Sequence, residues 1–166
     1  TTRGRGGGTV VEEVRPVRLP DQANIGDRNS EITDTVIFRR VIEPGACFVA
    51  ASQTLSTESR SLLRDCLNDL SEASSPTRYR QADARLHLSI ASVCGSSELT
   101  KACSMIQTKI HQFLEEIPFL EKNIAHSERQ HQRIVKSILD GDAEVARSVM
   151  EDHCDATAAL LKGLLK

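Results

Sequence analysis

From about Asp27 to the end of the chain, aliphatic side chains recur at steps of three and four residues. The first such stretch contains Ile32, Val36 and Val41, and no long stretch alternates with a period of two. This spacing places the aliphatic side chains on one face of an α-helix. Aromatic residues make up only 3% of the 166 residues, so the core must be built from Leu, Ile, Val and Ala, which favours helices packed on helices.

Residues that begin or end helices divide this pattern into segments with short connections. Helix starts are predicted at residues that can cap an N-terminus: Ser56 or Thr57, Ser75 followed by Pro76, Ser96 or Ser97, and Asp142. Helix ends are predicted at Gly95, Pro118 and Gly141, with another start near Leu120 or Ser127. Pro44 predicts a kink inside the first helix. The sequence therefore predicts an all-α fold, an antiparallel bundle of six or seven helices.

The first twenty residues differ from the rest of the chain. They begin T-T-R-G-R-G-G-G-T, and this glycine content disfavours a helix, while Val10 and Val11 suit a short strand. We expect a tail or linker over residues 1–20 and one helical domain over residues 21–166.

Charge and hydropathy argue against several classes of protein. Lys and Arg total 21 and Asp and Glu total 23, a net charge of -2, which argues against nucleic-acid binding by this chain alone. No stretch approaches the roughly 20 apolar residues of a membrane span. The five cysteines form no C-x-x-C pair, so we expect reduced thiols in the core and a cytoplasmic location.

Two pairs of polar residues fall where they can meet inside the bundle. Asp83 and His87 are four residues apart, so their side chains share one helix face. If no other residue is considered, the simplest interpretation of this spacing is a surface ion pair. His131 and His153 lie at equal distances from the turn at Asp142, so the two imidazoles are level in an antiparallel hairpin. Both lie on aliphatic stripes, and His87 likewise lies with Ile90 near one face of its helix. An unpartnered imidazole at such a position is costly. A shared metal ion satisfies all four side chains.

The other two histidines have no such placement. His126 is level with Ala158 across the same turn, and His111 lies near the end of its helix. We expect both at the surface; a second ligand set would replace one of the four residues by His111.

Several motifs occur in a recognisable order. D-x-x-x-H at residues 83–87 is followed by A-S-V-C-G-S-S-E-L at 91–99, by H-x-x-I at 131–134 before G-D-A at 141–143, and by M-x-x-H at 150–153. The first helix carries R-R-V-I-E-P at residues 39–44. Together these motifs resemble the ligand-sensing C-terminal (FCD) domain of GntR-type transcription regulators, FadR-like branch, over about residues 28–160. The glycine-rich start resembles the wing that closes the winged-helix DNA-binding domain of this family.

The resemblance implies specific roles. Asp83, His87, His131 and His153 match positions that in many members bind a divalent metal, often zinc, sometimes nickel or manganese. Arg39 matches an arginine that can bind the carboxylate of a small organic acid; a surface salt bridge to Glu43 is the equal alternative. Ser96 stands where the family commonly has Asn, which bears on helix capping or effector choice.

The implied protein is a homodimeric regulator and not an enzyme. Residues 1–20 would be the wing remnant and linker, and residues 21–166 the effector-binding and dimerisation domain. Operator DNA would be bound through a winged-helix domain missing from this chain, and effector binding would shift the equilibrium between helix arrangements. Two alternatives stay open: a metalloenzyme that uses the three histidines and Asp83, and a metal-free helical interaction module.

Overall fold

The computed structural model describes residues 2–3, 9–10 and 22–163. Its helices are α1 Gln22–Ala51, α2 Thr57–Ser71, α3 Pro76–Val93, α4 Ser97–Glu115, α5 Glu121–Asp140 and α6 Ala143–Lys162. Strands β1 (Thr2–Arg3) and β2 (Thr9–Val10) pair antiparallel. The predicted all-α bundle is confirmed, with six helices in the described part of the chain. Most of the expected wing remnant lies outside the described residues.

Hydroxyl caps begin three of the helices at the predicted places. Ser56, Ser75 and Ser96 each accept a hydrogen bond from the backbone N–H three residues later. These bonds satisfy N–H groups that the first turn of a helix leaves without a partner. Ser96 therefore performs the capping role at the start of α4, where the resemblance leads one to expect Asn.

The connections between helices also follow the sequence. Gly95 and Gly141 have φ angles of 76° and 85°, the left-handed conformation that favours glycine. Helix α5 begins at the earlier of the two expected places, with Leu120 at its cap position. Asp142 stands at the cap position of α6, but its side chain makes no capping hydrogen bond.

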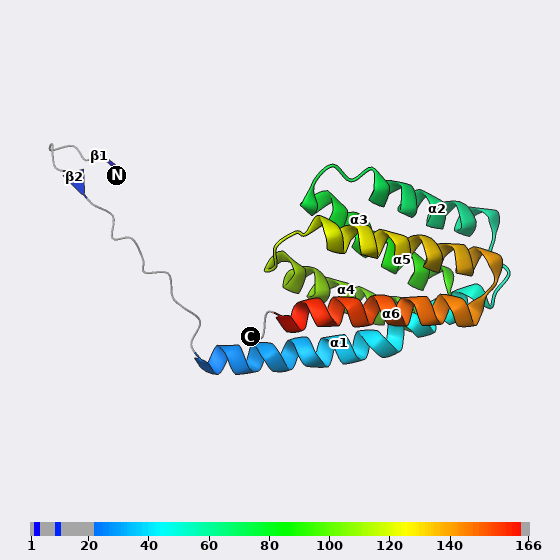
Figure 1. Ribbon diagram of the computed structural model, residues 1–166, viewed down its shortest axis with the longest axis horizontal. Coiled ribbons are helices and arrows are strands. Elements are labelled where there is room, and N and C mark those ends of the chain that lie inside the picture. Colours follow the sequence, from blue (N-terminus) through cyan, green and yellow to red (C-terminus); the bar gives the residue numbers. More distant parts are fainter. Residues whose placement is uncertain (1, 4–8, 11–21, 164–166) are drawn as a thin grey trace.

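Helix α1 organises the bundle. It begins at Gln22, earlier than expected from the periodicity, and continues through Pro44 as one helix of 30 residues. It packs against α6 along its length and also contacts α3, α4 and α5. In Figure 1, α1 and α6 run in opposite directions, as do α5 and α6. The predicted antiparallel arrangement is thus present around the α5–α6 hairpin.

The core is aliphatic, as the low aromatic content requires. Its largest cluster joins α1, α2, α3, α5 and α6 through fully buried side chains such as Leu63, Leu86, Ile134 and Met150. All five cysteines are buried and free, which confirms their expected role as small core residues. None of the described helices combines the length and apolarity needed to cross a bilayer.

Candidate metal and ligand site

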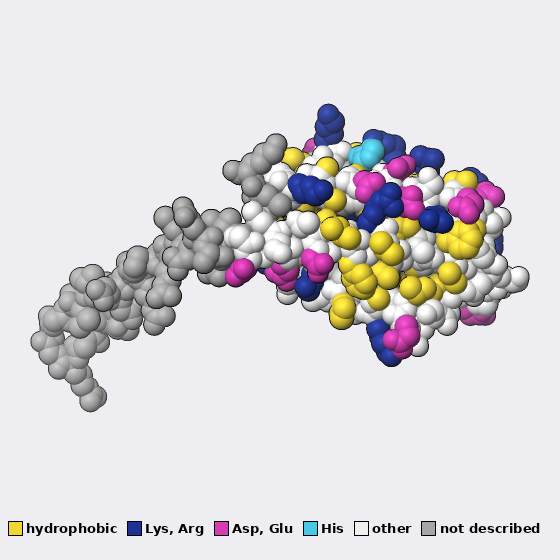
Figure 2. Space-filling model, turned by 90° about the horizontal axis from the view of Figure 1, so that it is seen from below, with side chains coloured by type: hydrophobic (Ala, Val, Ile, Leu, Met, Phe, Trp, Pro, Cys, Tyr) yellow, Lys and Arg dark blue, Asp and Glu magenta, His cyan; other side chains and the backbone are white. Residues whose placement is uncertain are grey.

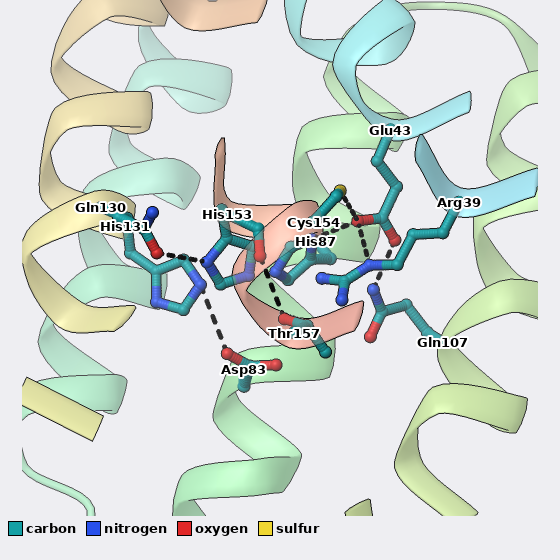
Figure 3. A network of polar contacts seen from close by, with 10 residues as sticks. All are labelled: Arg39, Glu43, Asp83, His87, Gln107, Gln130, His131, His153, Cys154 and Thr157. Carbon is teal, nitrogen blue, oxygen red and sulfur yellow. Dashed lines mark hydrogen bonds and ion pairs between the residues drawn. The ribbon is translucent and has the colours of Figure 1, made fainter. Parts of the chain in front are cut away.

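The four predicted metal ligands converge inside the bundle (Figure 3). Asp83 and His87 come from α3, His131 from α5 and His153 from α6. Each offers one ligand atom, and these atoms lie within 4.8 Å of one another. The centroids of the His131 and His153 rings are 4.5 Å apart, so the two imidazoles are level across the hairpin, as the turn position predicts. The rings of His87 and His153 are 5.1 Å apart.

The burial of this cluster costs free energy unless its ring nitrogens have binding partners. The exposed fractions of His87, His131 and His153 are 2%, 1% and 3%, while Asp83 is partly exposed. Nε2 of His87 and Nδ1 of His131 are buried and have no hydrogen-bond partner. A buried polar atom without a partner costs about 1–3 kcal/mol. A divalent cation satisfies such atoms, and three imidazoles with one carboxylate are a donor set that suits zinc, nickel or manganese. The residues present therefore fit a metal ion.

The protonation state of the imidazoles also suits a metal. Burial lowers the pKa of His131 to about 4, and it lowers the pKa of His153 well below its ordinary value. Both rings are consequently neutral at pH 7 and offer a lone pair. Only the neutral imidazole can ligate a metal ion.

Two residues outside the cluster orient its imidazoles. Nδ1 of His153 lies 3.1 Å from Oε1 of Gln130, and Nδ1 of His87 lies 2.9 Å from Oε2 of Glu43. Both oxygens are acceptors, so a proton on Nδ1 of either ring would face an oxygen and would leave Nε2 available as a ligand atom. Metal-ligating histidines are usually held in this way by a carboxylate or carbonyl group.

Arg39 and Glu43 form an ion pair, and the pair is buried. Nε of Arg39 donates to Oε2 of Glu43 at 2.8 Å, and their side chains are only 2% and 3% exposed. The predicted salt bridge is therefore present, but it is buried, so the prediction that it lies at the surface is wrong. Nη1 of Arg39 is buried without a partner, and Arg39 lines a cavity, as the alternative interpretation required. Arg39 therefore pairs with Glu43 and also lines the cavity.

Glu43 was predicted only as a surface partner of Arg39, and its other buried contacts were missed. Its Oε1 accepts a hydrogen bond from Nε2 of Gln107 at 2.5 Å, and Sγ of Cys154 lies 3.8 Å from its Oε2. Burial alone would raise the pKa of Glu43, but the charge of Arg39 and the imidazole of His87 outweigh it, so the pKa lies well below its usual range. Glu43 is an anion that contacts both Arg39 and a predicted metal ligand.

Gln107 and Gln130 were also missed, although the periodicity contained a signal for both. Gln130 lies four residues before Ile134 on the buried face of α5, and Gln107 lies four residues after Cys103 on that of α4. A polar residue on such a stripe needs a buried partner. Searching the stripes for amides as well as for histidines would have found them.

A cavity of about 450 Å³ opens beside the cluster. Arg39, Asp83 and His153 line it, and Gln130 and Thr157 lie beside them. The side chains around these residues are mostly apolar and come from the ends of α4 and α6, the start of α5 and the connection between α4 and α5. A cavity of this size with a few converging polar groups is typical of a small-molecule site.

The two remaining histidines lie at the surface, as predicted. His126 is exposed, and the half-buried His111 is 3.4 Å from Glu115. Neither belongs to the cluster in the described part of the chain, so the second ligand set, with His111, finds no support.

The structure is an all-α bundle with a cavity beside a cluster of three histidines and one aspartate. The family model of the FCD domain matches residues 34–156, so the chain belongs to the FCD domain family and the resemblance noted from the motifs is confirmed. Eleven chains of solved structures match the fold. One of them is GntR from Streptococcus agalactiae, with a TM-score of 0.70 and 19% identity over 80% of this chain. The match spans 60% of that regulator. No curated protein matches the chain.

Proposed function

We propose that this chain is the effector-binding and dimerisation domain of a GntR-type transcription regulator, and that it senses a small organic acid at a metal site. The observation that carries the proposal is the convergence of Asp83 and three imidazoles on a cavity that Arg39 also lines. Membership of the FCD family favours a regulator over an enzyme.

The metal would be held by Asp83, His87, His131 and His153. Zinc is our first choice because imidazole and carboxylate ligands suit it, and nickel and manganese follow. When bound, the ion would supply a Lewis acid for an anionic oxygen of the effector. Glu43 and Gln130 would keep the rings of His87 and His153 oriented, through the contacts described above.

Arg39 would bind the effector's carboxylate. Its Nε is committed to Glu43, while Nη1 is buried without a partner on a side chain that lines the cavity. A guanidinium group held in this way presents its remaining N–H groups with little loss of side-chain freedom. An acid between Arg39 and Asp83 would contact residues of α1 and α3 together with His153 of α6.

Regulation would follow from this position. An effector favours the helix arrangement that it binds more tightly. The size of the shift in equilibrium is limited by the difference between its affinities for the two arrangements. In a homodimer, such a shift would change the spacing of two winged-helix domains that bind operator DNA. A regulator of this kind acts in the cytoplasm.

An apolar surface supports the homodimer. Figure 2 shows hydrophobic side chains gathered on the face that α1 forms. Val41, Ile37 and Met105 of α1 and α4 are exposed by 68%, 61% and 62%. We propose that a second copy of the chain covers this surface, the apolar patch. The Val41→Asp variant should then sediment as a monomer where the parent sediments as a dimer, and a monomeric parent would contradict the proposal.

The metal site is tested by binding and stability together. We expect mass spectrometry of protein purified without chelator to find one divalent ion per chain. His153→Ala should lower zinc affinity at least tenfold and remove the rise in melting temperature that zinc causes. His111→Ala is the matched control, because His111 lies at the surface beside Glu115 and outside both the cluster and the cavity lining. A stable parent that neither contains nor binds zinc would contradict the proposal.

A further inference from the structure

We infer that the effector is a monocarboxylic acid with an extended apolar body, and not a small hydrophilic acid. This inference rests on the proposed function and specifies its ligand class. It comes from the volume and lining of the cavity, which has polar groups beside the histidine cluster and mostly apolar walls.

The polar end of the cavity is small. Arg39, Asp83 and His153 lie there, and Gln130 and Thr157 are already committed within the protein. Gln130 contacts Nδ1 of His153, and the hydroxyl of Thr157 donates to the His153 carbonyl. One carboxylate group can therefore find its partners at this end. The lining also contains the polar side chains of Lys122, Asn123, His126, Ser127 and Arg129, which all come from the first half of α5, so a second polar group of a ligand would have to lie against that one helix.

The walls are apolar over most of their extent. The side chains responsible are aliphatic or aromatic: Leu114, Ile117, Phe119, Leu120, Ile124 and Leu160. Phe119 packs edge-on against Tyr79, with ring centroids 5.8 Å apart, which holds this part of the wall in place. Such a surface gains most from a ligand that displaces water with methylene or aromatic groups.

The volume of the cavity also favours a ligand with an extended apolar body. A cavity of about 450 Å³ has room for roughly fifteen water molecules at the volume each occupies in the liquid. An acid of two to four carbons would leave most of that space filled with water against apolar walls. Each additional buried methylene should instead tighten binding roughly fourfold, until the cavity is filled.

The charges around the cavity select an anion. Arg80, Lys122 and Arg129 line it in addition to Arg39, while Asp83 is the one acidic residue of the lining. Arg80 is held in place, because it donates to the carbonyl of Ile117 and lies over the ring of Phe119. Its guanidinium group is thus part of the wall and is not free to fork onto a second carboxylate.

The experiment is calorimetric titration of the zinc-loaded protein with butyrate, hexanoate, octanoate and succinate. We expect affinity to rise roughly fifteenfold for each pair of added methylenes, with octanoate tightest and succinate no better than butyrate. Succinate or butyrate binding as tightly as octanoate would overturn the inference and leave the proposed function intact. Failure of every acid to bind would overturn both.

Variants separate binding in the cavity from adsorption elsewhere. Leu160→Asn should weaken octanoate at least tenfold and leave butyrate and zinc binding unchanged. Ala156→Leu adds bulk from an exposed position of the lining, so it should exclude octanoate without disturbing the core. Met105 lies on the apolar patch and outside the cavity lining, so Met105→Asn should change neither octanoate binding nor butyrate binding. If Met105→Asn abolishes octanoate binding while Leu160→Asn and Ala156→Leu do not, the acid binds the patch and the inference is wrong.

Discussion

Replacing Glu43 by glutamine removes the negative charge that compensates a fully buried arginine. The change keeps the size of the side chain, so packing around it is preserved. It leaves Arg39 charged at 2% exposure, and it replaces the acceptor that faces Nδ1 of His87. Glu43→Gln therefore tests whether this carboxylate holds the centre of the bundle together.

The expected loss is large for one conservative substitution. Removing one partner of a buried ion pair costs about 3–5 kcal/mol, because the other charge stays buried without compensation. For a chain of this size, 1 kcal/mol corresponds to about 2–4 °C of melting temperature, so we expect a fall of roughly 6–20 °C. Zinc affinity should also fall about 10–100-fold, since His87 loses the group that orients it.

The assay is urea unfolding in the presence of a chelator, so that metal binding does not contribute. Asp155→Asn is the matched control: it breaks an ion pair of similar length, 2.8 Å, with the neighbouring Arg40, and Asp155 is 60% exposed. An exposed pair contributes about 0–1 kcal/mol. The double variant Arg39→Gln with Glu43→Gln should cost much less than the sum of the two single changes, because no buried charge remains. Equal, small losses for Glu43→Gln and Asp155→Asn would refute the reasoning.

Two further predictions concern the imidazoles. Gln130→Leu removes the acceptor for His153, so zinc affinity measured by competition with a chromophoric chelator should fall about 10–100-fold, whereas Gln132→Leu, at an exposed position of the same helix, should have no effect. In metal-free protein the pKa of His131 is about 4, whereas in the unfolded chain it is near 6.5. The unfolded chain therefore binds a proton more readily, and the free energy of unfolding decreases as the pH falls from 6.5 to 4. Urea unfolding should show a loss of at least about 2 kcal/mol from pH 7 to pH 5, since His153, whose pKa is also lowered by burial, adds to the contribution of His131. Constant stability over this range would contradict the burial of neutral rings.

Local features of the fold could be predicted because they depend on neighbouring residues. A hydroxyl at Ser56, Ser75 or Ser96 caps its helix by bonding an N–H three residues away, and Gly141 ends α5 in a left-handed conformation. The register of the α5–α6 hairpin follows from its short turn. That register alone placed His131 level with His153, which is half of the candidate metal site.

The cluster required one more step, because α3 is separated in sequence from α5 and α6. The aliphatic stripes showed that His87 points inward, and the motifs of a known family suggested which residues meet. Residues without such a motif were missed. Gln107 and Gln130 are buried and hydrogen-bonded, and their only signal was a position on the aliphatic stripes, without a motif to say which partners they would meet.

The sequence by itself determined the all-α class, most of the helix ends and the inward faces, and the family motifs that it contains identified the four candidate ligands. Only the tertiary structure decided that the pair of Arg39 and Glu43 is buried, that Glu43 also faces His87, and that a cavity with apolar walls opens beside Asp83. The physical reason is that a spacing of four residues brings two charges together on any helix, whereas their burial depends on which other helices cover that face. Cavity volume, likewise, is what remains after side chains from separate helices have packed.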